Sequence, residues 1–483
     1  MAVKTREEYL AALKKMRPNI YKFGELIEDV TTHPATKRTV ESHARCFDAA
    51  NDADLEKMYT TTSMFTGEKI QRWNCMMQDH GSLIQNMRFK RQNYRRTGSC
   101  TGAVCVGWNA MNVMWAVTED MDAEYGTNYK ERLKNWILNA QKEGLTVAGA
   151  LTDAKGDRSK PPSQQDDPDT NLHVKEVRED GIVIRGAKLM ICGTAAAQEI
   201  FLLPGSGYKE PDADYALACV VPRDIEGLTI VEARHPSDKR ELEETADVEV
   251  PDTGITQGWL LFDDVFVPNE RVFMCREAKY SGKVIQYFTS NYRACIGGCV
   301  TGQGDVMIGA SILMARANGL KTKTFMNKLV DMSINNTITF GLGAGACALG
   351  FQHSSGSFFA DPHTAHTNKV MVATLPYEVK RLTQEIGGGI VETGCMPSYA
   401  DVSHPEYGPF LKKCLKAGGP SAETRFKAAR LSEWLTIGAG VPGCMHGGGS
   451  PDGAKLVVRF TTPMEEYVDY ARNIINIEEA VTE

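Results

Sequence analysis

The sequence predicts an α+β protein in three successive parts: an N-terminal helical domain at 1–146, a central β domain at 147–275 and a C-terminal helical bundle at 276–483. Three observations predict this division. Apolar residues recur at near-helical intervals before residue 146. Glycine- and proline-rich loops and short β-branched runs follow up to residue 275. Helical periodicity then returns for the remainder of the chain.

The composition narrows the class of protein. The chain has 483 residues, a net charge of −7 and 24% charged residues, so no basic surface favours nucleic acid or an anionic membrane. It contains no run of eighteen apolar residues to span a bilayer, and its first residues lack the apolar core of a signal peptide. Thirteen cysteines are an odd number, which argues against a secreted disulfide framework. We therefore expect a cytoplasmic protein with cysteines that are reduced or bound to metal.

Helical patterns dominate the first part of the chain. Thr5 and Glu8 have the spacing of a capping box and predict a helix start. Further helices are expected at 53–59, 70–86, 106–125 and 128–142. Apolar and aromatic side chains recur along 106–125 and are typical of either a buried face or a cofactor-facing stripe: Met111, Met114, Trp115, Val117 and Met121.

The central part contains loops and strands. Residues 149–158 and 161–168 are rich in glycine, proline and polar residues and are expected to form loops. Strands are expected at 172–179 and 182–190, on either side of Asp180-Gly181, a pair typical of a type I′ hairpin turn. Further strands are expected where β-branched and aromatic residues gather, at 215–221 and 259–267.

Helices are expected again in the last part. The periodic segments are 297–319, 327–349, 376–387, 424–437 and 464–477. Glycine clusters at 387–389 and 447–449 interrupt them. Neither cluster follows a strand with Gly-x-Gly-x-x-Gly spacing, so the sequence does not support a Rossmann dinucleotide-binding fold.

Two pairs of cysteines are the main candidates for chemistry. Cys100 and Cys105 lie in a glycine-punctuated loop that leads into the helix expected at 106–125. Three residues separate Cys295 from Cys299, which places both on one helical face. Four residues separate Cys100 from Cys105, so this pair converges only if one member lies in the loop. The two pairs predict a four-thiolate iron–sulfur site, with ordinary buried thiols as the alternative.

Longer motifs give a family resemblance that covers essentially the whole chain. It is carried by residues 21–25, 105–107, 152–158, 178–188, 262–269, 297–299 and 445–447. The chain resembles the 4-hydroxybutyryl-CoA dehydratase and 4-hydroxyphenylacetate 3-hydroxylase superfamily, and the dehydratase branch more than the aromatic hydroxylases. The resemblance implies an acyl-CoA dehydrogenase-like fold, a homotetramer, bound FAD and a [4Fe-4S] cluster near the flavin.

The resemblance also implies cluster ligands. In the dehydratase branch three cysteines and one histidine hold the cluster, and Cys100, Cys105 and Cys299 match the three thiolates. The position of the histidine is occupied by Tyr292. Cys295 lies one turn before Cys299, so it is expected to replace the missing ligand and give an all-cysteine cluster.

Other polar residues of the dehydratase site are exchanged as well. Its two glutamates correspond to Gln257 and Gly443, and its tyrosine and lysine near the third thiolate to Ile296 and Val300. These exchanges remove groups that move protons, so the sequence predicts a divergent relative with another substrate or another reaction.

The remaining candidates concern the flavin and the chemistry. Backbone amides beside glycines approach phosphates closely, which favours three segments as flavin loops. They are the loop Thr152–Arg158 (Thr152, Lys155, Gly156, Asp157 and Arg158), the post-strand segment Cys192-Gly193-Thr194, and the run Gly387–Gly389 with Gly387 and Gly388. Ordinary structural loops are the alternative. Tyr292, His446 and Gln257 are the catalytic candidates, although Tyr292 is equally a packed aromatic and His446 a turn cap.

Three classes of function remain open. The first is a flavin and iron–sulfur dehydratase, lyase or isomerase acting on a hydroxyacyl-CoA or related small substrate. The second is a flavin-only oxidoreductase or monooxygenase with a vestigial cluster site. The third is a non-catalytic relative that uses the scaffold for assembly. An all-cysteine cluster lacks a readily displaced ligand, which favours electron transfer or structural support over Lewis-acid catalysis.

Overall fold

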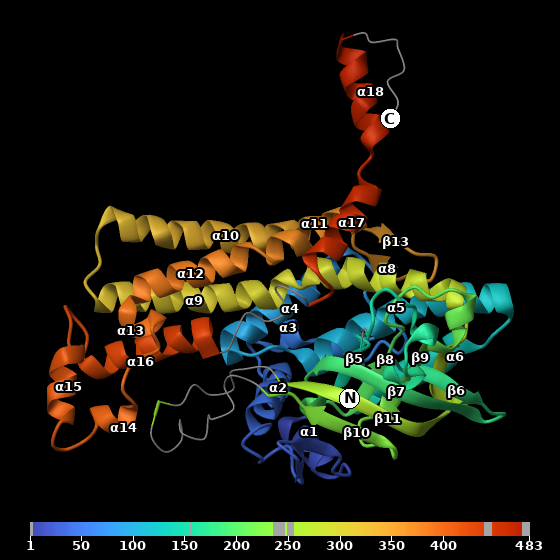
Figure 1. Cartoon of the computed structure of the whole chain (residues 1–483), viewed down its shortest axis with the longest axis horizontal. Helices are drawn as coiled ribbons and strands as arrows, with labels where there is room; N and C mark the ends of the chain where they lie inside the picture. Colours follow the sequence, from blue (N-terminus) through green and yellow to red (C-terminus); the bar gives the residue numbers. More distant parts are fainter. Residues whose placement is uncertain (1–2, 155, 235–246, 249–255, 439–446, 476–483) are drawn as a thin grey trace.

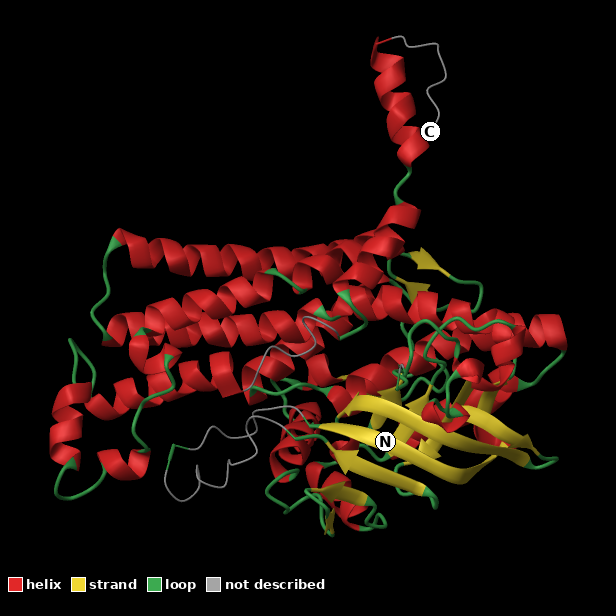
Figure 2. Ribbon diagram, in the orientation of Figure 1, coloured by secondary structure: helices red, strands yellow, loops and turns green. Residues whose placement is uncertain are grey.

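The computed structural model describes residues 3–154, 156–234, 247–248, 256–438 and 447–475. Long helices form one layer and two sheets lie below it (Figures 1 and 2). Helices α4 (His80–Thr97) and α5 (Gly102–Tyr125) lie between them, because α4 packs on α9 above while α5 packs on α8 and on β5. The junction of α4 and α5 therefore meets both layers, and the expected α+β class is confirmed.

The N-terminal helices begin and end where their sequences favour it. The Thr5 hydroxyl accepts from Glu8 N, and the Glu8 carboxylate accepts from Thr5 N, which confirms the capping box. Gly98 ends α4 with φ 69°, in the left-handed region that favours glycine. The other helices of this part are α1 (Arg6–Lys14), α2 (Lys37–Ala50), α3 (Glu56–Tyr59) and α6 (Tyr129–Glu143).

The helix expected at 70–86 is wrong over its first half. Lys69–Gln71 form strand β4, which pairs with β3 (Thr60–Thr62), and the helix begins only at His80. Asp79 explains that start, because its carboxylate accepts from Ser82 N in a second capping box. Cross-strand pairing therefore overrides the helical spacing of Ile70 and its neighbours.

Two sheets form the β part. The larger has the strand order β2-β1-β10-β11-β7-β6, and the smaller has the order β12-β9-β8-β5. Their strands are β1 (Ile20–Lys22), β2 (Glu25–Ile27), β5 (Val147–Ala150), β6 (His173–Val177), β7 (Gly181–Cys192), β8 (Glu199–Leu202), β9 (Leu217–Pro222), β10 (Leu228–Glu232), β11 (Gln257–Pro268) and β12 (Val272–Cys275). Residues 20–27 thus contribute two strands to a sheet built mainly from the central part.

The expected hairpin is present, but its turn differs from the expected type. Strands β6 and β7 pair antiparallel, with Val177 opposite Ile182. A type I′ turn needs positive φ at both central residues, and neither Asp180 nor Gly181 has it. Instead Arg178 N donates to Gly181 O across a longer connection. The hairpin prediction is confirmed and the type I′ prediction is wrong.

The C-terminal part is helical, as expected. Its helices are α8 (Ala278–Cys295), α9 (Gly297–Ala317), α10 (Lys323–Ala348), α11 (Pro362–Val372), α12 (Leu375–Gly387), α13 (Gly389–Glu392), α14 (Tyr399–Val402), α15 (Gly408–Leu415), α16 (Ala422–Glu433), α17 (Pro451–Thr461) and α18 (Met464–Ile475), with a small hairpin of β13 (Phe351–Gln352) and β14 (Phe358–Phe359). Helix α18 projects away from the body of the molecule (Figure 1). Within the described ranges, no helix has the length and apolar character needed to cross a bilayer.

Candidate functional site

The two predicted cysteine pairs lie around one lysine. Cys100 precedes α5 and Cys105 lies in its first turn, while Cys295 ends α8 and Cys299 lies in the first turn of α9. Burial acts to lower the pKa of Lys90, on α4, yet these four thiols together raise it above its ordinary value. The fold thus brings residues separated by nearly two hundred positions to one place.

Lys90 makes this place electropositive. Its side chain is 3% exposed, and its ammonium lies 5.6 Å from the centroid of the Tyr292 ring. The largest effects that raise its pKa against burial come from thiols. A buried ammonium requires negative charge nearby, so sulfur is the charge partner that this site offers. Sequence analysis missed Lys90 because helix 80–97 carries several basic residues that look alike in the sequence.

A further thiol, Cys192, lies against the same turn. It ends β7, opposite Gln257 of β11, whose Nε2 donates to the Cys192 sulfur at 3.5 Å. A Cβ added to Gly102 would lie 2.6 Å from the Cys192 Cβ, and one added to Gly193 would lie 2.4 Å from Ala103 N. The end of β7 therefore touches the chain between Cys100 and Cys105.

The thiols of the site differ in exposure, and burial raises the pKa of two of them. Cys100, Cys192 and Cys299 are half-buried, whereas Cys105 is 5% and Cys295 is 3% exposed. Burial raises the pKa of Cys100 well above its ordinary range, and Cys192, Cys105 and Cys299 raise it further. Burial also raises the pKa of Cys299 to about 11, against the opposing effect of Lys90.

Tyr292 borders the thiols on α8. It stacks on Phe288, with ring centroids 5.4 Å apart. Burial raises its pKa well above the ordinary value, and Cys105, Cys192, Cys299 and Cys100 raise it further, so its phenol stays protonated at neutral pH. Tyr292 can therefore donate a hydrogen bond but does not serve as a base.

An apolar wall stands beside Tyr292 and Cys299. It consists of Ile296, Val300 and Val372, all at most 2% exposed. The first two are the positions at which the dehydratase branch carries a tyrosine and a lysine. No group on this wall can move a proton, which agrees with the divergence expected from the sequence.

A histidine that sequence analysis missed fixes the start of α5. Ala103 N donates to His43 Nε2 at 3.1 Å, so the Nδ1 proton is donated to Thr39 O at 2.7 Å. Burial lowers the pKa of His43 to about 4, which keeps the ring neutral and able to accept. This contact could not be recognised in the sequence, because its two partners are sixty residues apart and meet only in the folded chain.

The third catalytic candidate, His446, lies outside the described residues, as do Lys155 and Gly443. The chain just beyond it reaches the site. Gly448 packs against the Tyr292 ring, and its carbonyl accepts from Arg293 Nε at 2.8 Å. The role assigned to His446 stays a prediction.

The first two flavin candidates belong to the β part. Thr152 O accepts from Leu189 N at 2.8 Å, while Gly156, Asp157 and Arg158 are exposed. The loop is held by Asp157, whose carboxylate accepts from the Ser159 amide and hydroxyl. Gly193 has φ 73°, and the buried Thr194 hydroxyl donates to Glu232 at 2.9 Å.

The third flavin candidate lies elsewhere. Gly387 ends α12 and Gly388 starts the short turn of α13, at the end of the helical layer far from the sheets (Figure 1). The structure thus brings Gly193 and Thr194 to the thiols but does not bring Gly387 and Gly388 there. All three flavin assignments stay predictions.

Donor chemistry and spacing test whether a metal group fits. Within the described ranges, no three histidine, cysteine or carboxylate side chains are spaced to hold a single ion. A four-iron cluster is several ångströms across, so its ligands meet its corners and not one point. The thiols and the buried Lys90 cation match the soft, anionic character of such a group.

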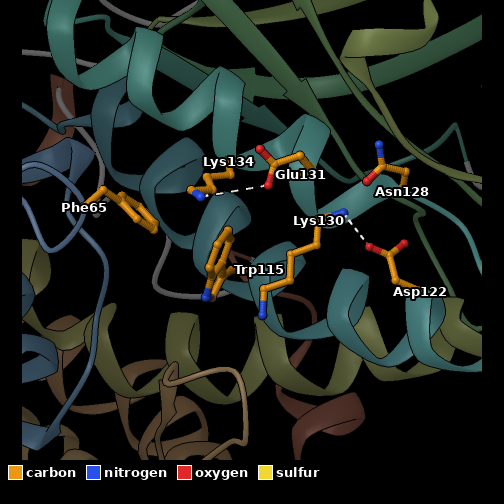
Figure 3. Close-up of a pocket in the computed structure, with 7 residues that line it drawn as sticks. All are labelled: Phe65, Trp115, Asp122, Asn128, Lys130, Glu131 and Lys134. Carbon is orange, nitrogen blue, oxygen red and sulfur yellow. Dashed lines mark hydrogen bonds and ion pairs between the residues drawn. The ribbon is translucent and has the colours of Figure 1, made fainter.

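A separate hollow lies beside α5 and α6 (Figure 3). Its volume is about 400 Å³ and it is lined by Phe65, Trp115, Asp122, Asn128, Lys130, Glu131 and Lys134. Its charges are paired: Lys134 contacts Glu131 at 3.9 Å, and Lys130 contacts Glu119. None of the predicted site residues lines this hollow.

Comparisons with known proteins show the family to which the chain belongs. The family model for the 4-hydroxyphenylacetate 3-hydroxylase N terminal matches residues 5–274, and that for the C terminal matches residues 281–476. The chain is 34% identical over 470 residues to 4-hydroxybutyryl-CoA dehydratase/vinylacetyl-CoA-Delta-isomerase of Clostridium aminobutyricum, covering 94% of this chain and 95% of that protein. It is 25% identical to the oxygenase component of 4-hydroxyphenylacetate 3-monooxygenase of Thermus thermophilus, covering 90% and 88%.

Solved structures agree. An oxygen-tolerant archaeal 4-hydroxybutyryl-CoA dehydratase from N. maritimus superposes with a TM-score of 0.95 at 32% identity, covering 99% of this chain and 96% of that chain. A glutaryl-coenzyme A dehydrogenase superposes with a TM-score of 0.51 at 13% identity, covering 80% and 81%, which confirms the acyl-CoA dehydrogenase-like fold alone. The chain therefore belongs to the 4-hydroxyphenylacetate 3-hydroxylase family and resembles its 4-hydroxybutyryl-CoA dehydratase members over nearly its whole length.

Proposed function

We propose that the protein is a flavin-dependent, dehydratase-like enzyme that holds FAD and a [4Fe-4S] cluster and acts on a hydroxyacyl-CoA or a related small substrate. One observation carries this proposal: the thiols of Cys100, Cys105, Cys295 and Cys299 lie around the buried Lys90, and the Cys192 thiol of β7 joins three of them beside Tyr292. The chain's homologues are enzymes, among them a dehydratase of a CoA thioester. An HpaB oxygenase of the same fold was solved with FAD.

The residues of this chain have distinct parts in the proposed site. Lys90 offsets negative charge on sulfur, and the Gln257 amide donates to Cys192. The Tyr292 phenol keeps its proton and can donate to a substrate oxygen. The apolar wall formed by Ile296, Val300 and Val372 limits water beside Cys299. A flavin supplies one-electron chemistry when bound, and a cluster supplies redox or structural support.

The chain departs from its dehydratase relatives in its proton-moving groups. Tyr292 stands in place of a histidine base and Gln257 in place of a glutamate. We therefore propose a substrate or a reaction different from that of the Clostridium enzyme, in which the phenol acts as an acid or donor. Assays with 4-hydroxybutyryl-CoA and with vinylacetyl-CoA test this directly. Turnover near the level of that relative would contradict the proposed divergence.

Anaerobic purification followed by an absorbance spectrum tests the cofactors. Flavin bands with a broad iron–sulfur shoulder, together with stoichiometric FAD, iron and sulfide, are the expected result. Flavin bands alone would favour a flavin-only oxidoreductase of the 4-hydroxyphenylacetate 3-hydroxylase type, which the matched family models also allow. A colourless, folded protein that takes up neither group would favour a role in assembly.

We further propose that the enzyme is a homotetramer. Four apolar side chains form an exposed stripe at successive turns of α10: Met326, Val330, Ile334 and Ile338, each at least 41% exposed. A second copy of the chain is the occupant proposed for this stripe, because α10 lies on the outer face of the helical layer (Figure 1).

A further inference from the structure

We propose that Cys192, and not Cys295, supplies the fourth thiolate beside Cys100, Cys105 and Cys299. The inference rests on the proposed [4Fe-4S] cluster and assigns one of its ligands. Cys192 stands at the end of a β-strand, in the segment singled out from sequence as a flavin loop. It is the thiol that the fold, and not the sequence spacing, brings to the site.

Backbone contact places Cys192 on the turn that carries two other ligands. The residues at the junction are so close that a side chain on Gly102 would meet the Cys192 backbone carbon at 2.8 Å. Gly193 N donates to Thr256 O at 3.0 Å, which fixes the end of β7 in this position. Because Cys192 lies on β7 and Cys105 on α5, the distance between these two residues is set by the fold.

The surroundings of Tyr292 point to the same four thiols. Tyr292 occupies the position that matches the family's histidine ligand. The thiols that raise its pKa after burial are those of Cys105, Cys192, Cys299 and Cys100. Cys192 thus lies near the side chain that occupies the position of the missing histidine.

The Cys295 side chain packs in the hydrophobic core. Its thiol donates to Leu83 O at 3.7 Å, and the neighbouring Cys347 thiol donates to Met87 Sδ at 3.8 Å. The nearness of Cys295 to Lys90 is explained by the packing of α4 against α8.

Cys192 differs from Cys295 in its exposure and in its hydrogen bond. It is half-buried, and its sulfur accepts a hydrogen bond from Gln257 at 3.5 Å. Amide donors to sulfur are a common feature of iron–sulfur sites, where they tune the reduction potential. Gln257 replaces a glutamate of the dehydratase branch, and only the amide can donate to sulfur.

The test compares Cys192→Ser with Cys295→Ser in the anaerobically reconstituted full-length protein. Iron, sulfide and FAD per chain are measured, with electron paramagnetic resonance after reduction and a thermal melt to check folding. Cys192→Ser is expected to retain iron at least about tenfold less well against a chelator, with FAD unchanged. Cys295→Ser is expected to retain iron as the wild type does.

Iron loss in the Cys295→Ser variant overturns the assignment, whether or not the Cys192→Ser variant also loses iron. Full retention of iron in the Cys192→Ser variant overturns it as well. A second measurement needs no variant: alkylation of Cys192 and Cys295 in the wild type, before and after iron is stripped. Cys192 is expected to become reactive only after stripping, and equal reactivity in both states overturns the proposal. A wild type with FAD but without iron refutes the cluster itself, which separates failure of the proposed function from failure of this assignment.

Discussion

Single residues set the charge of the site. Lys90 is buried, which acts to lower its pKa, and the thiols around it raise that pKa above its ordinary value. The same physical chemistry explains Tyr292, whose phenol is surrounded by thiols and therefore resists ionisation. The Lys90 cation therefore favours the thiolate form of Cys299, whereas the Tyr292 phenol remains neutral.

Removal of the Lys90 cation should suppress thiol reactivity. Lys90 opposes the burial that raises the pKa of Cys299 to about 11. In Lys90→Gln that opposition is lost, so alkylation of Cys299 in iron-free protein at fixed pH is expected to slow by about tenfold. Peptide mass spectrometry measures the rate. Arg88→Gln removes an exposed cation from the same helix and is expected to leave the rate unchanged.

The His43 contact should make stability fall in mild acid. Burial lowers the pKa of His43 from 6.5 to about 4, so the unfolded chain binds a proton before the folded protein does. The stabilisation is complete above pH 6.5 and is lost as pH falls toward about 4, by up to about 3 kcal/mol. Urea unfolding at several pH values measures this. His43→Gln should flatten the dependence in that window, and an unchanged slope would contradict the assignment.

At the scale of elements, the contact between α5 and β7 forms the site. Gly102 is required there because the Cys192 backbone leaves no room for a Cβ. Gly102→Ala is expected to destabilise the protein by about 1–3 kcal/mol and to reduce iron retention. Gly309→Ala, on α9, is the matched control, since a Cβ there meets nothing within 4 Å. Equal melting temperatures for Gly102→Ala and Gly309→Ala would contradict the close contact between Gly102 and Cys192.

Local chemistry predicted much of the fold. The Thr5 capping box, the β6–β7 hairpin and the long C-terminal helices follow from local spacing and are confirmed. Strand β4 was missed because its helical spacing is overridden by pairing with β3. Strands β1 and β2 were missed because three-residue strands carry too little pattern to recognise.

The candidate site was predictable only in part. The motif resemblance pointed to Cys100, Cys105 and Cys299, which the fold brings together. Cys192 and Lys90 could not be found by spacing, because each joins the site through a contact between elements distant in sequence. Periodicity along one helix also favoured Cys295, whereas its thiol direction depends on packing against α4 and α10.

At the scale of the whole molecule, the outer helical face remains apolar. Ile334 lies at the middle of the α10 stripe and is 51% exposed. Ile334→Lys is expected to shift the proposed tetramer toward smaller species, because a buried charge at an interface carries a large desolvation cost. Sedimentation velocity measures the shift. Thr62→Lys, an equal charge change at the exposed end of strand β3, is expected to leave the distribution unchanged, and a monomeric wild type would remove the claim.

We propose that this family member assembles an all-thiolate [4Fe-4S] cluster in place of one with a histidine ligand. Mössbauer spectroscopy of anaerobically prepared protein enriched in a suitable iron isotope tests it most directly. We expect a four-iron signal in which every iron has the isomer shift of tetrahedral sulfur coordination. A four-iron signal with one distinct site bound by nitrogen or oxygen, or a flavin-containing protein without iron, would contradict it.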